Sequence, residues 1–246
     1  MTGAPSLPGA PVPPDPDARL AKDTAQNRAY LAIRNAIMAG HFHPGTVLTL
    51  RRLSEMFNVG EMPIRESLKR LAAEGAFEAL PNRSARVPRL SRRQIAQILD
   101  LRLELEGRAA ADAVENISKR HIEELVALDH QMNVSHAAGS LLDYAALNQK
   151  FHFLIYGLAQ NETLYSLIEA LWLRMGPLVS FSVAFSSKAS AALREASAVH
   201  HVDLIDALRV HDVEAARAAL CADLSHLTQV PGYWEAMENA PHIPTL

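Results

Sequence analysis

The hydrophobic positions of this chain follow a helical period over most of its length. In the N-terminal part they predict a long helix over residues 19–39 and two short helices over residues 50–57 and 63–74. Two short runs of strand-forming residues follow, over residues 77–80 and 85–88, with turn-forming residues between them. Three helices and a hairpin in this order are typical of a winged helix-turn-helix, an α+β unit whose third helix enters the major groove of DNA.

The rest of the chain shows only the helical period. Six helices are predicted between residues 91 and 229, without an alternating strand pattern. Ser91 and Gln94 form a capping-box pattern at the first of them, and Ser118 and Asn161 are suited to cap two others. The sequence therefore predicts an all-α antiparallel bundle of about six helices.

Composition and charge divide the chain further. Residues 1–17 hold six of the 14 prolines and are expected to form a disordered tail, residues 18–90 the winged-helix unit, residues 91–230 the bundle, and residues 231–246 a C-terminal tail. The net charge of −3 conceals a contrast, because residues 18–90 carry 12 Lys and Arg against 6 Asp and Glu, whereas residues 91–246 carry 12 against 19. Only the first unit is thus expected to bind a polyanion such as DNA.

Some classes of protein are excluded by composition. One cysteine, Cys221, allows neither a disulfide framework nor a multi-cysteine zinc module. No apolar run reaches the roughly 20 residues of a membrane helix, and residues 1–16 lack the features of a signal peptide. We therefore expect a cytoplasmic, nucleoid-associated protein that has no membrane partner.

Motifs in the basic unit resemble those of GntR-family transcriptional regulators. Residues 39–48 are similar to the opening motif of that family, residues 53–59 to its second helix, residues 63–75 to its recognition helix and residues 83–87 to its wing. The resemblance implies contacts with double-stranded operator DNA at the starts of two helices and in the wing. The candidate DNA-binding residues are Arg51, Arg52, Glu61, Met62, Arg65, Arg83 and Arg86.

The recognition helix departs from the family pattern at its start. The family usually has Ser or Thr, Arg and Thr before the proline, whereas this chain has Gly60, Glu61 and Met62. A carboxylate cannot pair with phosphate, so Glu61 either accepts a hydrogen bond from a cytosine amino group or faces solvent. The fold transfers to this chain, but the operator sequence does not.

The bundle resembles the FCD ligand-binding domain of the FadR subfamily. The resemblance rests on residues 101–106, on residues 148–152 followed by Asn161, and on His201 with residues 207–212. Family members that hold a metal present Asp or Asn together with three His. The resemblance therefore implies a divalent ion, zinc, nickel or manganese, on Asn148, His152, His201 and Asp223, with His226 as an alternative to Asp223. The other interpretation is that the two histidines are buried and hydrogen-bonded without a metal.

The same cavity is expected to bind a small organic acid. Arg102 would pair with the carboxylate of this effector; alternatively it forms a salt bridge with Glu106, four residues later on the same helix. Trp172, Arg174 and Phe181 are candidates for the pocket wall.

The function expected from both halves is that of a homodimeric, ligand-responsive repressor that binds a pseudo-palindromic operator. Two His and one carboxylate also occur in non-haem iron oxygenases, but those sites are built on β-scaffolds, so we do not expect an enzyme. Two alternatives stay open: a metal-binding helical enzyme, and a winged helix that binds protein instead of DNA.

Overall fold

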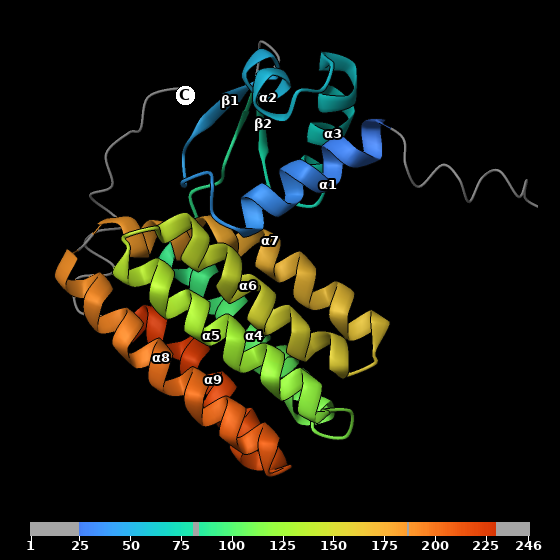
Figure 1. Cartoon of the computed structure of the whole chain (residues 1–246). Helices are drawn as coiled ribbons and strands as arrows, with labels where there is room; N and C mark the ends of the chain where they lie inside the picture. Colours follow the sequence, from blue (N-terminus) through green and yellow to red (C-terminus); the bar gives the residue numbers. More distant parts are fainter. Residues whose placement is uncertain (1–24, 81–83, 186, 230–246) are drawn as a thin grey trace, which may run out of the picture.

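The computed structural model describes residues 25–80, 84–185 and 187–229 of the 246-residue chain. Within this part, a small N-terminal unit of helices and strands sits on one side of a larger helical bundle (Figure 1). The predicted fold class is thus confirmed. Both predicted tails and Arg83 lie outside the described residues, as does the side chain of Phe181.

The N-terminal unit has the winged-helix arrangement. Its elements are α1 (Ala25–Met38), β1 (Val47–Thr49), α2 (Leu50–Phe57), α3 (Glu61–Ala73), β2 (Glu78–Leu80) and β3 (Ser84–Arg86). The strands form an antiparallel sheet in the order β1-β3-β2, with Leu48 opposite Ala85 and Ala79 opposite Ala85. The sequence pattern missed β1, because three residues are too few to show alternation. Gly45 has a φ of 86° in the turn before β1, a conformation that favours glycine.

The helix α3 begins at Glu61, two residues earlier than predicted. Gly60 is its N-cap and provides no side-chain hydrogen bond, so the helix begins without the hydroxyl cap that is usual in the family. Pro63 falls within the first turn, where its missing N–H group has no intrahelical partner to lose. As a result, Glu61 and Met62 belong to the recognition helix instead of the loop before it.

The bundle consists of the six predicted helices. They are α4 (Arg92–Ala113), α5 (Lys119–Ala137), α6 (Leu141–Leu158), α7 (Glu162–Phe185), α8 (Ser187–Arg209) and α9 (Val213–Gln229). The capping box of Ser91 and Gln94 is present, and Asn161 Oδ1 accepts from the N–H of Leu164 at 3.0 Å. Helix α4 packs against α6, α7 and α9, at the centre of the bundle. Among the described residues, no helix is both long enough and apolar enough to cross a bilayer.

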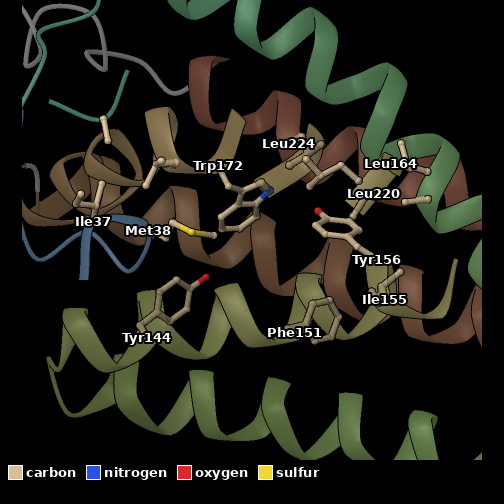
Figure 2. Close-up of a cluster of buried hydrophobic side chains, with 14 of the residues drawn as sticks. Ile37, Met38, Tyr144, Phe151, Ile155, Tyr156, Leu164, Trp172, Leu220 and Leu224 are labelled. Carbon is tan, nitrogen blue, oxygen red and sulfur yellow. The ribbon is translucent and has the colours of Figure 1, made fainter. Parts of the chain in front are cut away.

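Helix α7 joins the two units. One buried core runs from Ile37 and Met38 of α1 past Trp172 of α7 to Tyr156 of α6 (Figure 2). At Gly176, a Cβ atom would lie 2.6 Å from the carbonyl oxygen of Ile37 and 2.7 Å from the Cα of Met38. The backbones of α1 and α7 approach so closely that only glycine fits, and this contact fixes where the N-terminal unit sits on the bundle.

Candidate functional site

The start of helix α3 presents three of the candidate DNA-binding side chains. Glu61 and Met62 are exposed, and Met62 keeps 62% of its surface in solvent. Arg65 is half-buried, and its Nε atom is buried without a hydrogen-bond partner among the described residues. Arg65 follows exposed Glu61 and Met62 near the start of α3, so its guanidinium group is a candidate to bind a phosphate or a guanine edge.

The start of helix α2 carries two more cations. Thr49 caps the helix by accepting from the N–H of Arg52 at 3.2 Å. The side chain of Arg51 is 85% exposed, and its Nε lies 2.9 Å from Glu55 Oε1. The pKa of Arg51 is raised, first by this hydrogen bond and the charge of Glu55, and also by the charge of Glu61. The carboxylate of Glu61 is therefore close enough to act on Arg51, one of the candidate DNA-binding cations.

The wing contributes one described cation. Arg86 ends β3, and its side chain is 41% exposed, with Nη1 3.7 Å from Glu78 Oε2 on β2. Such an exposed pair contributes little to stability. It leaves Arg86 available for a phosphate.

Three of the candidate metal ligands come together in the bundle. His152 Nε2 of α6 lies 3.3 Å from Asp223 Oδ2 of α9, and His201 Nε2 of α8 lies 3.7 Å from Asp223 Oδ1. One ligand atom from each residue falls within 4.8 Å of the other two, and both histidines are 1% exposed. Two metal–nitrogen bonds of about 2.1 Å span at most about 4.2 Å, so small ring rotations bring all three within reach of one ion.

The hydrogen bonds around His152 determine which nitrogen carries a proton. Burial, and then the charge of Glu106, raise the pKa of Tyr156 well above its usual value, so its hydroxyl keeps its proton and donates it to Glu106 Oε2. The oxygen of Tyr156 then accepts from Nδ1 of His152, 3.1 Å away. In the neutral imidazole, Nε2 is left with a lone pair that faces the carboxylate of Asp223.

A similar arrangement holds His201. Its Nδ1 lies 3.5 Å from Asp129 Oδ1 of α5, and its Nε2 is buried without a hydrogen-bond partner among the described residues. A carboxylate behind a histidine is the usual support of a metal ligand. Two imidazoles and a carboxylate that face one another are a donor set that fits a divalent metal, and the same geometry allows the histidines to donate hydrogen bonds to Asp223 without a metal.

The other two candidate ligands are placed differently. Asn148 is half-buried on α6, four residues before His152, and thus on the same face of that helix. His226 does not join the cluster, because its ring lies against His200, with the centroids 5.9 Å apart. Of the two alternatives that the sequence left open, Asp223 is the one that faces the histidines.

Glu106 is the centre of a buried polar network next to the cluster. Its carboxylate is fully buried and accepts from Tyr156, from Trp172 Nε1 at 2.9 Å and from Arg102 Nη2 at 3.2 Å. Arg102 is itself 3% exposed, and Nε lies 2.5 Å from Glu106 Oε1. Burial alone would lower the pKa of Arg102, but the charge of Glu106 and the hydrogen bonds to it raise that pKa. Of the two predicted roles of Arg102, the structure has the salt bridge.

Of the three candidates for the pocket wall, the two whose side chains the structure describes lie in different places. Trp172 packs against the cluster, with its ring 5.5 Å from the ring of His152. Arg174 does not line this site: its Cδ and Nε lie 3.8 Å from where a Cβ on Gly75 would be, beside the N-terminal unit. Residues two apart on a helix point about 200° apart, so α7 cannot direct both side chains to one cavity.

Sequence reasoning missed two residues that orient the histidines. Tyr156 lies four residues after His152 on α6, and this spacing is a usable signal. Asp129 lies 72 residues before His201 on a different helix. No local pattern connects those two.

Comparison with known proteins identifies the family. The gntR family of bacterial regulatory proteins matches residues 25–87, and the FCD domain matches residues 97–226. This chain is a GntR-family regulator with an FCD domain. It is accordingly a DNA-binding transcriptional regulator, and the relatives described below are regulators too, not enzymes.

Relatives of the regulator match three quarters or more of its length. The transcriptional regulator McbR of Escherichia coli is 31% identical over 76% of this chain and 84% of its own length. The transcriptional repressor RspR of E. coli is 26% identical over 81% of this chain and 86% of its own. The solved structure of E. coli McbR has a TM-score of 0.78 at 27% identity, covering 87% of this chain and 98% of the other. A GntR regulator from Rhodococcus shares the fold at 16% identity, with a TM-score of 0.66.

Proposed function

We propose that this regulator is a homodimeric repressor whose bundle binds a small carboxylate effector through a divalent metal on Asn148, His152, His201 and Asp223. The proposal rests on one observation: buried ring nitrogens of His152 and His201 face the carboxylate of Asp223. His152 Nε2 lies 3.3 Å from a carboxylate oxygen, and His201 Nε2 has no hydrogen-bond partner among the described residues. In a dry site, facing lone pairs repel unless a cation lies between them.

The effector would act by changing the placement of the two reading units, residues 18–90 of each chain, on the bundles of residues 91–230. An octahedral ion such as manganese, held by these four ligands, keeps two open positions for a carboxylate. Trp172 connects the cluster to α1, because its ring lies 5.5 Å from that of His152 and its side chain lies between Met38 and Tyr156 in the buried core (Figure 2). A ligand that binds one arrangement better shifts the population toward it. The two-fold dimer would read a pseudo-palindrome, and the repressor RspR among the relatives supports the direction of control.

The donor set favours a particular kind of metal. Asn148 and Asp223 offer oxygen where zinc sites usually have nitrogen or sulfur, which lowers the preference for zinc and nickel and favours manganese. The test is elemental analysis of the purified chain followed by competition among zinc, nickel and manganese. The proposal predicts one ion per chain; no bound ion with any of the three metals would contradict it.

Tyr156→Phe is expected to lower the affinity for that metal by about 10- to 100-fold, the usual effect of losing a group that orients a ligand. The change removes only the hydroxyl that holds Nδ1 of His152. Competition with a fluorescent chelator measures the loss. Tyr165→Phe is the matched control, because Tyr165 lies on α7 beside Phe153 and away from the histidines. Equal affinity in wild type and Tyr156→Phe would show that Tyr156 does not orient the ligand.

Arg65→Ala is expected to weaken specific operator binding by roughly 1–3 kcal/mol, the value of one good base contact. The place of Arg65 near the start of α3 is the reason. Fluorescence anisotropy on the native operator measures the change. Lys69→Ala, later on the same helix and paired with Glu66, is the control. An unchanged affinity would show that Arg65 does not contact the operator.

Glu61→Arg is expected to change the preferred half-site, because arginine makes a bidentate contact with guanine that a carboxylate cannot make. Glu61 lies in the exposed first turn of α3. Site selection from a random library, run with both proteins, compares the two consensus sequences. Identical sequences would mean that Glu61 only faces solvent.

A further inference from the structure

A cleft separates the reading unit from the bundle on the side of α1 that faces α6. Its volume is about 610 Å³, and its walls come from α1, the end of α2, α6 and α7. Ligand sites typically have volumes of roughly 300–1,000 Å³, are mostly apolar with a few polar groups, and occur at domain boundaries. This cleft has the size, the lining and the location of such a site.

The cleft results from how the two units are joined. Helix α1 packs closely on α7 at Gly176 but has few contacts with α6. The walls facing each other across the gap carry short side chains, Ala32 and Ala36 on α1 and Ala146 on α6. Helix α1 is thus held close to α7 at Gly176, and the cleft lies where α1 is not packed against α6.

The polar groups of the cleft leave a positive charge. Arg34 Nη1 of α1 lies 2.9 Å from Glu169 Oε1 of α7, so these two charges neutralise each other. Lys150 of α6 also lines the cleft and is exposed, and no carboxylate pairs with it in the described part of the chain. The charge that remains attracts an anion.

An aromatic wall lies beside this charge. Phe153 of α6 lines the cleft and is only partly buried. Its ring also contacts Tyr165 at 5.5 Å and Trp172 at 5.3 Å between centroids. A flat apolar group stacked on Phe153 would be separated from Trp172 only by the Phe153 ring. Trp172 in turn contacts His152.

We propose that this cleft is a second ligand site, which takes a small organic anion with a flat apolar body. The anionic group lies at Lys150, and the body packs against Phe153 and the alanines of α1. The site is separate from the metal cluster, because Lys150 and His152 are two residues apart and point to opposite sides of α6. A ligand that bridges α1 and α6 in the cleft changes how α1 sits against the bundle and thereby changes operator affinity.

The probe for this site is 8-anilinonaphthalene-1-sulfonate, an aromatic sulfonate that fluoresces when it leaves water. The full chain is titrated with it, with and without EDTA. We expect saturable binding that EDTA leaves unchanged. Lys150→Glu should weaken it at least about tenfold, since the attraction to the sulfonate becomes repulsion. Ala146→Trp and Ala32→Trp should each abolish it by filling the cleft from opposite walls, so that one variant failing to fold leaves the other as the test.

Lys119→Glu is the matched control. Lys119 is an exposed lysine beside a different hollow, at the start of α5, and its reversal should leave probe binding unchanged. The probe should also shift operator affinity in wild type and have no such effect in either tryptophan variant. Binding that survives both tryptophan variants, that EDTA removes, or that Lys119→Glu weakens as much as Lys150→Glu would overturn the proposal. Because no step needs the metal, failure of the metal site alone would leave this test intact.

Discussion

Replacing both His152 and His201 with alanine is expected to abolish metal binding and the response to effector while leaving operator binding largely intact. The pair supplies both nitrogen ligands, and only the oxygens of Asn148 and Asp223 would remain, too few to compete with water for a divalent ion. The reading unit packs around Ile33, Leu53 and Ile64, and both histidines lie outside it, on α6 and α8. Metal content, effector titration and anisotropy on operator DNA measure the three effects.

The matched control replaces His200 and His226, whose rings meet edge to face and which lie on the same two helices that carry His201 and Asp223. This variant also loses two imidazoles but should keep the metal. Loss of metal in the control would place His226 among the ligands and correct the assignment of Asp223. Retention of metal in the His152 and His201 variant would show that the ion, if any, binds elsewhere.

Glu106→Ala is expected to destabilise the chain by about 3–5 kcal/mol, the usual cost of leaving one partner of a buried ion pair unpaired. Arg102 is 3% exposed, so its charge would stay in the bundle without Glu106, and Tyr156 and Trp172 would each lose an acceptor. Urea unfolding measures the free energy. Glu104→Ala on the same helix is the control, because its side chain is 76% exposed and should change stability by less than about 1 kcal/mol.

The same pair determines how an effector role for Arg102 has to be tested. Arg102→Ala alone leaves Glu106 buried and charged, so a lost response could reflect poor folding. The double variant Arg102→Met with Glu106→Gln removes both charges and should recover most of the stability lost in Glu106→Ala. A loss below about 1 kcal/mol in Glu106→Ala would mean that the ion pair does not anchor the bundle.

The helices of the bundle were predictable because several of them begin at a capping residue that can be recognised in the sequence. Ser91 with Gln94, Ser118 and Asn161 all cap the helices that the sequence assigned to them. The misses in the reading unit also have local causes. A three-residue strand such as β1 is too short to show an alternating pattern. The start of α3 was predicted two residues too late, because Gly60 indicates a helix start less clearly than a residue with a hydroxyl group does.

The candidate metal site was predictable only through the family resemblance. His152, His201 and Asp223 lie on three helices, and no spacing along the chain shows that their side chains meet. Asp129 was missed for the same reason. The direction of Arg174 was missed because α7 serves two neighbours, the bundle core at Trp172 and the reading unit at Gly75. Helical period alone does not show which neighbour each side chain faces.

The central claim is that two buried histidines and Asp223 share one divalent ion. Anomalous scattering from crystals of the full chain grown with manganese or zinc tests it most directly. The account predicts one anomalous peak per chain, about 2.1 Å from Nε2 of both His152 and His201 and in contact with Asp223. Histidines hydrogen-bonded to Asp223 with no peak between them, in crystals that contain either metal, would contradict it.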